Sequence, residues 1–215
     1  MTIQVGQQIA VPGFIKCLDN FLGSGAGQGI NAYGQELENC EGRKPTFRAS
    51  IGAFTPQATP QDFLTLTGNP LCVVRLLAVE VYLAATAAAA FEVFLNYNSA
   101  PDTGGTSTTP TAVPSDPSDP GWTTALATVN AYTVAPTAGT KVGSIRSGRV
   151  VGGTIAGGGS GICPLVWVFG QYGDKCPILR TASQQIALNG NGAALPAGSV
   201  FEINILWLEE TLTGN

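Results

Sequence analysis

The chain has 215 residues, contains no histidine, carries a net charge of -4, and only 11% of its residues are charged. Its ten basic residues are scattered, which disfavours nucleic-acid binding, because neutralising phosphates takes dense Lys and Arg. The lack of histidine excludes Ser-His-Asp and Cys-His catalysis and His-containing zinc sites, and leaves carboxylate, Lys or Tyr mechanisms open.

Residues 1–45 differ in pattern from the rest. Glycine occupies every second position from residue 23 to 29, and no apolar period is sustained on either side. Glycine loses much freedom when it is held in one conformation, so this segment predicts an extended arm with a flexible joint. The alternative, a phosphate-cradling loop, needs a buried strand before it and a helix after it, and the flanking residues favour neither.

From residue 47 onward, apolar and polar side chains alternate with a period of two, which is typical of strands. The alanine-rich residues 84–90 are too few to hold a helix unaided and predict a strand end, a turn and a strand start. Residues 98–121 predict a long loop. The strand-like runs are 47–51, 63–67, 72–83, 91–97, 122–132, 142–155, 165–169, 178–180, 184–188 and 200–208. Together they predict an all-β domain over residues 46–215, a sandwich or barrel.

The acidic residues offer few candidate pairs. Glu209 and Glu210 are adjacent, so on a strand they point to opposite faces. Glu80 and Glu92 are able to share one face of a hairpin, although each also fits the polar side of its strand. A glycan-cleaving enzyme needs two carboxylates about 5 to 9.5 Å apart in a cleft. We therefore predict no catalytic residues.

Asp116 and Asp119 lie among prolines in the predicted loop. Calcium needs six or more oxygen ligands, and the dense acidic spacing of an EF-hand is missing here. A solvated loop is the favoured interpretation, so no metal or cofactor site is predicted.

The aromatic and sulfur-containing residues suggest packing. Trp122, Trp167 and Trp207 would suit a sugar-stacking platform, but the last two fall inside apolar strands, which favours the core. None of the five cysteines shows Cys-x-x-Cys spacing, and Cys72 in an apolar strand is interpreted as a small buried hydrophobe. The disulfide candidates are Cys17, Cys40, Cys163 and Cys176.

Residues 47–210 resemble a family of small structural proteins of tailed-bacteriophage virions. The resemblance covers about three quarters of the chain and is carried by Phe47-Arg48-Ala49-Ser50, Phe54-Thr55-Pro56, Gly104-Gly105-Thr106-Ser107, Val113-Pro114, Ala131-Tyr132-Thr133, Pro164-Leu165-Val166-Trp167, Ala187-Leu188-Asn189 and Pro196-Ala197-Gly198. It implies a jelly-roll-like antiparallel β-sandwich without enzymatic activity, which decorates or reinforces the capsid or the neck or collar. The arm with Cys17 and Cys40 is not part of the resemblance.

Low charge leaves neutral surface for contacts, so we expect a homo-oligomer, and the resemblance implies a trimer. The other expected partners are virion proteins such as major capsid or neck proteins, with no nucleic acid and no membrane. The N-terminus lacks a secretory signal, and the apolar run 81–91 is shorter than the roughly 20 residues that a membrane helix needs. We therefore expect synthesis in the host cytoplasm and assembly into the virion. The alternative function is a receptor- or carbohydrate-binding domain of a virion appendage.

An odd number of cysteines leaves at least one thiol free or paired outside the chain. A phage particle meets oxygen once lysis has released it from the reducing cell. We therefore predict at least one disulfide between subunits, with Cys17 or Cys40 of the arm as donor.

Overall fold

The computed structural model describes residues 29–30, 36–37, 45–118, 123–153, 163–171 and 175–211. The chain forms two units, Met1–Lys44 and Pro45–Asn215. In the first unit, β1 (Gly29–Ile30) and β2 (Glu36–Leu37) pair antiparallel. Most of the glycine-rich joint, and both Cys17 and Cys40, lie outside the described residues.

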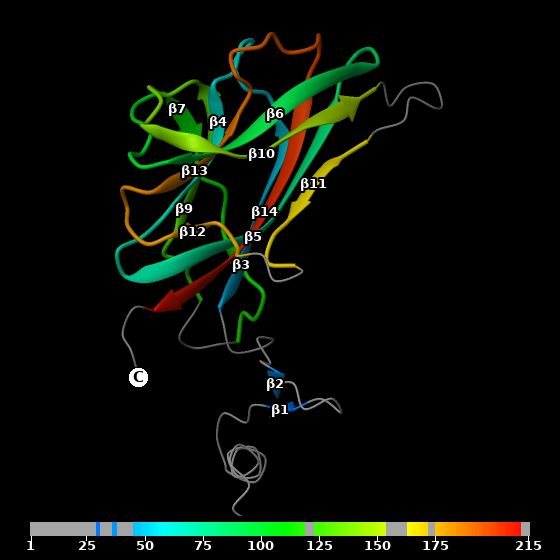
Figure 1. The fold of residues 1–215 in the computed structure, drawn as a ribbon. Coiled ribbons are helices and arrows are strands. Elements are labelled where there is room, and N and C mark those ends of the chain that lie inside the picture. The colour runs from blue at the N-terminus through cyan, green and yellow to red at the C-terminus, as the bar shows by residue number, and fades with distance from the viewer. Residues whose placement is uncertain are drawn as a thin grey trace, which may run out of the picture. The chain divides into compact units, whose positions relative to one another are not determined.

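The second unit is a sandwich of two antiparallel sheets, which confirms the predicted fold class (Figure 1). Its strands are β3 (Thr46–Phe54), β4 (Asp62–Thr67), β5 (Cys72–Ala84), β6 (Ala89–Asn98), β7 (Thr106–Thr108), β8 (Val113–Pro114), β9 (Thr128–Val134), β10 (Lys141–Gly152), β11 (Leu165–Val168), β12 (Ile178–Leu179), β13 (Gln185–Asn189) and β14 (Val200–Thr211). The first sheet has the order β10-β6-β13-β4-β9-β7, and the second has the order β11-β5-β14-β3-β8, with β12 paired to β5. No helix in the described part of the chain is able to cross a membrane.

The strand order is that of a jelly roll. Strands β3, β5, β11 and β14 belong to the second sheet, whereas β4, β6, β10 and β13 belong to the first, so successive strands mostly cross from one sheet to the other. The first and last of these eight strands, β3 and β14, lie side by side. Two interleaved Greek keys of this kind define the jelly roll.

The connection between β6 and β10 adds strands to one side of the sandwich. Within it, β9 pairs with β4, β7 pairs with β9, and β8 pairs with β3. The prediction of an unstructured loop over 98–121 was therefore wrong where β7 and β8 form, because pairing with a neighbour, and not alternation, makes these polar segments strands. The predicted strand 122–132 was wrong at its start, because β9 begins only at Thr128. On the opposite side, β10 and β11 are the outermost strands of their sheets (Figure 1).

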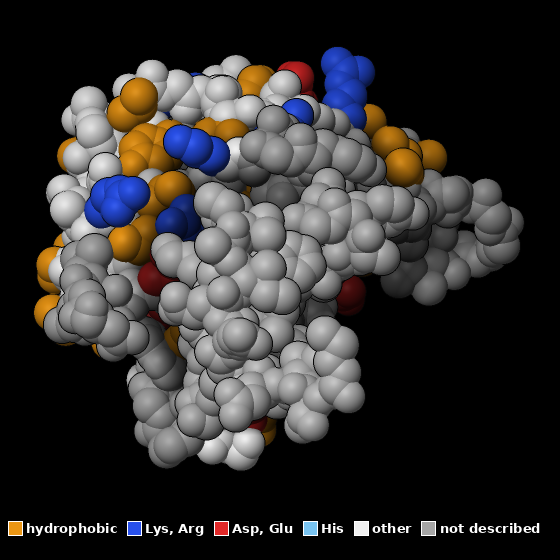
Figure 2. Space-filling model, turned by 60° about the horizontal axis from the view of Figure 1, so that its bottom comes forward, with side chains coloured by type: hydrophobic (Ala, Val, Ile, Leu, Met, Phe, Trp, Pro, Cys, Tyr) orange, Lys and Arg blue, Asp and Glu red, His pale blue; other side chains and the backbone are white. Residues whose placement is uncertain are grey.

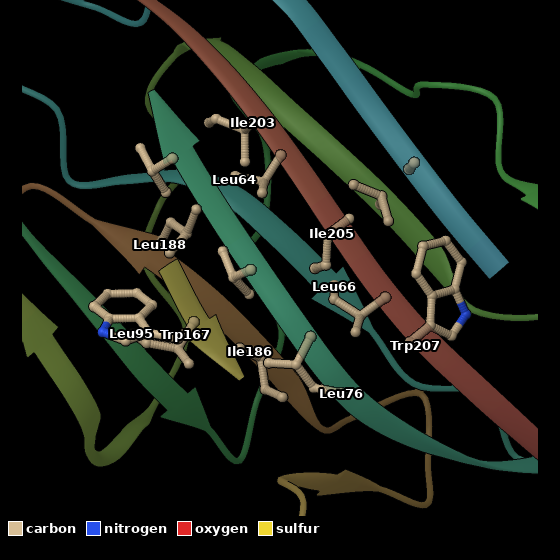
Figure 3. Packing of buried hydrophobic residues seen from close by; sticks show 14 of the residues in the cluster. Leu64, Leu66, Leu76, Leu95, Trp167, Ile186, Leu188, Ile203, Ile205 and Trp207 are labelled. Atoms are coloured by element: carbon tan, nitrogen blue, oxygen red, sulfur yellow. The ribbon is translucent and has the colours of Figure 1, made fainter. Parts of the chain in front are cut away.

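The core fills the space between the sheets (Figure 3). Central strand β14 contributes Phe201, Ile203, Ile205 and Trp207, each at most 3% exposed, as its alternation predicted. The Trp207 ring stacks on Phe47 at a centroid distance of 6.0 Å. Trp167 is also buried, so the core interpretation of both tryptophans is confirmed. Fully burying a side chain of this kind contributes roughly 1.5–3 kcal/mol.

Candidate functional site

Two carboxylates lie together under the surface of the first sheet. Asp62 begins β4 and is 3% exposed, and its Oδ1 accepts a 2.6 Å hydrogen bond from Asn189 Nδ2 on β13. Asp102 lies in the loop after β6, and its Oδ1 accepts a 2.8 Å hydrogen bond from Gly139 N. Its own N–H donates to Gln185 Oε1 at 3.1 Å. The two acids therefore join β4, β13 and the loops on either side of the β6–β10 connection.

The loops meet closely at this point. A Cβ at Gly139 would collide with the carbonyl oxygen of Ala100, so only glycine lets the Gly139 N–H approach the Asp102 carboxylate. Asp102 Oδ2 is buried and receives no hydrogen bond from the described residues. Asn98 Nδ2 lies 3.5 Å from both Asp62 Oδ2 and Asp102 Oδ1, so this amide links the two carboxylates.

The pKa of Asp102 is raised to about 6, mainly by burial, with a smaller contribution from the negative charge of Asp62; the hydrogen bonds from Gly139 N and Asn98 act in the opposite direction. Burial also raises the pKa of the Tyr132 phenol on β9, and both aspartates act on it in the same direction. The Asp102 carboxyl is therefore protonated in the folded protein in mildly acidic solution and mostly ionised at neutral pH.

The acidic pair does not have the geometry of a glycoside hydrolase. Such enzymes hold their carboxyl groups about 5 Å or more apart across a cleft, whereas Asp62 is covered and a single amide, Asn98 Nδ2, lies 3.5 Å from both carboxylates. In the described part of the chain, no group of three or more Cys, Asp or Glu side chains is arranged to hold a metal ion. The pair is therefore suited to tying the sheet and its loops together.

A second buried carboxylate, Glu209 on β14, is fully covered. Its Oε1 accepts hydrogen bonds from Ala127 N and Trp207 Nε1, both at 2.9 Å, and its Oε2 accepts one from Leu126 N at 2.9 Å. Burial, together with the nearby charge of Glu209 and a hydrogen bond to it, raises the pKa of the Cys72 thiol to about 12. Cys72 is therefore an unreactive core residue, as predicted.

The other described acidic residues that were candidates for catalysis or metal binding lie at different places in the fold. Glu209 and Glu210 point to opposite faces, as predicted, and Glu210 forms an ion pair with Arg75 at 3.0 Å. Glu80 lies on β5 in the second sheet and Glu92 on β6 in the first, so the hairpin that joins them crosses the sandwich and they share no face. Asp116 lies in an exposed turn and accepts a hydrogen bond from Ser118 N, while Asp119 lies outside the described residues.

The described cysteines are not paired. Cys72, Cys163 and Cys176 are all free thiols, and Cys163 is exposed. No disulfide therefore joins the candidates Cys163 and Cys176 within this unit. Cys17 and Cys40 lie outside the described residues, so a disulfide between subunits stays a prediction.

A pocket of about 340 Å³ lies where the outer strands β10 and β11 face each other. It is lined by Ile145, Arg146, Val168, Phe169, Gly170, Gln171, Lys175 and Pro177. Within the described ranges, neither Arg146 nor Lys175 forms an ion pair. No pattern in the sequence indicates this pocket or the Asp62–Asp102 pair, because both arise where distant segments of the chain meet.

Basic residues continue beyond the pocket. Arg75 lies opposite Ile178 of β12, and Arg180 directly follows that strand. On the face shown in Figure 2, Lys and Arg side chains lie close together among hydrophobic ones. Since Arg75 is paired with Glu210, the basic side chains that remain here are Arg146, Lys175 and Arg180.

The outer face of the second sheet carries apolar side chains. Val166 and Val168 on edge strand β11 are 48% and 45% exposed. Val168 lies opposite Ala78 on β5, and Ala78 lies opposite Leu206 on β14. Val168, Ala78 and Leu206 form a short apolar row across the sheet, on the side away from the core, whereas Val166 lies opposite Glu80 and the half-buried Leu208 lies opposite Arg75.

Comparisons with protein-family models, with curated proteins and with solved structures find no match to this chain. The class that the fold defines is an all-β jelly-roll sandwich.

Proposed function

We propose that this chain is a non-enzymatic structural protein of a bacteriophage particle, which decorates or reinforces the capsid or the neck or collar. It acts through contacts with copies of itself, as a trimer, and with neighbouring virion proteins. The observation that carries the proposal is the short apolar row of Val168, Ala78 and Leu206, with the exposed Val166 beside it, on the outer face of a sheet. Interface cores are depleted in charge and rich in such side chains.

The jelly roll itself supports the proposal only as an analogy, because one fold serves many functions. The resemblance to small virion proteins adds the particle context, and the low charge of the chain leaves wide neutral surfaces for association. The resemblance and the low charge together favour a protein that functions through contacts with other proteins.

Mass spectrometry and cryo-electron microscopy of the purified particle test this function. We expect the chain to be present in a fixed copy number, with the apolar row in contact with a neighbouring subunit on the head or neck. If the chain is absent from the purified particles, or if the row faces solvent in the particle map, the proposal is wrong.

The second candidate function is a receptor- or carbohydrate-binding domain of a virion appendage. The pocket favours it, because its two cations, Arg146 and Lys175, have no acidic partner among the residues that the structure describes. An aromatic stacking platform does not, because none of the aromatic side chains in the described ranges is exposed. Trp122 lies outside those ranges. Binding of the full-length protein to a glycan array tests this candidate.

A further inference from the structure

The pocket between β10 and β11 contains an arginine at a core-facing strand position. Arg146 pairs with Leu95, and two positions further along the ladder Gly148 pairs with the buried Val93. Residues directly opposite each other in an antiparallel pair share a face, so Arg146 lies on the core side of the sheet at its outer edge, where its side chain is exposed. Its guanidinium lies 6.0 Å from the centroid of the Phe169 ring.

This placement orients the guanidinium before any ligand arrives. A cation over an aromatic ring is held by the ring's negative face, so Arg146 is directed to the mouth of the pocket. Lys175, from the segment before β12, provides a second cation on the lining. Neither has a described acidic partner, and two unpaired cations in a concavity attract an anion.

The rest of the lining sets the size and polarity of the ligand. Val168, Phe169 and Pro177 form an apolar wall, and the Gln171 side chain adds an amide. A volume of about 340 Å³ is at the lower end of small-molecule sites, and it is suited to one sugar ring. Arginine presents a planar fork that matches a carboxylate with two parallel hydrogen bonds.

We propose that this pocket binds the carboxylate of an acidic sugar, such as a uronic or sialic acid residue of a glycan. The inference rests on the second candidate function, glycan binding, and is independent of the structural role.

The test is a nuclear magnetic resonance titration of the full-length, ¹⁵N-labelled protein with galacturonate and N-acetylneuraminate. Galactose is the neutral control, and inorganic phosphate is the competing anion. We expect the amide signals of Gly170, Gln171 and Lys175 to shift with the acidic sugars and not with galactose. Arg146→Gln and Lys175→Gln should each weaken binding about tenfold, because each removes a charged hydrogen-bond donor.

Arg149→Gln is the matched control. Arg149 lies three residues along the same strand and is exposed on its other face, opposite Glu92. Its replacement should leave the affinity unchanged. Equal weakening by all three variants would show only general electrostatic attraction and would overturn the proposal.

The remaining outcomes separate this inference from glycan binding in general. If no sugar shifts these signals while the glycan array shows binding that Arg146→Gln retains, the pocket assignment fails and glycan binding stands. If neither experiment detects a sugar, both fail. Equal shifts with phosphate overturn the choice of a carboxylate. Aggregation of Arg146→Gln without sugar binding by the wild type would instead assign Arg146 to protecting an edge strand, a known use of inward-pointing charges.

Discussion

Replacing Asp102 by asparagine should stabilise the protein, and the gain should grow with pH. The pKa of Asp102 is raised by burial from 3.8 to about 6, so the folded state holds a proton that the unfolded state releases. The contribution of this group is therefore fully present below pH 3.8 and is lost as the pH rises through about 6. Asparagine keeps an acceptor for Gly139 N and supplies a donor toward Asp62 without titrating.

The raised pKa of Asp102 sets the size of the expected gain in stability. A difference of about two pKa units corresponds to roughly 3 kcal/mol of stability lost by the wild type above pH 7. Asp102 is partly exposed, and solvent screening reduces this figure, so a gain of about 1–3 kcal/mol is expected for Asp102→Asn at pH 7.5. At pH 4 the gain should be well under 1 kcal/mol, because Asp102 is then mostly protonated in the folded state.

Urea unfolding between pH 4 and pH 8 measures this difference, with fluorescence of the buried Trp167 and Trp207 as the signal. Glu202→Gln, on the exposed side of β14, is the control and should change stability little at any pH. If Asp102→Asn is no more stable than the wild type at pH 7.5, or if its advantage does not change with pH, then burial does not raise the pKa of Asp102 in the folded protein.

Three further changes test other features. Glu209→Gln should lower the free energy of unfolding by about 2–4 kcal/mol, since one amide oxygen cannot accept all the buried donors; loss of under 0.5 kcal/mol in urea unfolding would contradict the account of that carboxylate. Leu206→Glu should reduce the mass of the full-length oligomer in light scattering, whereas Ser147→Glu on β10 should not; unchanged mass in both would remove the apolar row as an interface. Non-reducing electrophoresis of purified particles should show linked subunits that Cys40→Ser, alone or with Cys17→Ser, reduces to monomers; a monomer band in wild-type particles without reductant would contradict a disulfide between subunits.

Sequence periodicity predicted the strands whose two faces meet different environments. In β14, Phe201 to Trp207 alternates cleanly because one face meets the core and the other does not. Alternation does not reveal β7 or β8, which are exposed or half-buried and exist through pairing with β9 and β3. The sequence of these two strands is typical of a loop, because neither strand buries a side chain at every second position.

The candidate sites were harder to predict, for a similar reason. Asp102 gains its partner only when the loop containing Gly139 closes on Ala100, which is a contact between segments far apart in sequence. Arg146 did carry a signal, because it stands an even number of residues from the buried Val150. A charged residue on the same face of a strand as a buried residue indicates either protection of a sheet edge against pairing with other chains or a binding site.

The strands added by the β6–β10 connection have a consequence for how molecules can join edge to edge. On that side each sheet ends in a very short strand, β7 or β8, whereas the other side ends in β10 and β11. Open-ended growth by strand addition requires two usable edges per sheet. Val151 on β10 already exchanges two hydrogen bonds with Cys163, and the rest of this edge has no partner strand among the described residues. Joining there links a molecule to a single neighbour, so it stops at a pair and does not produce a fibre. Any larger closed ring must therefore be built through sheet faces or loops.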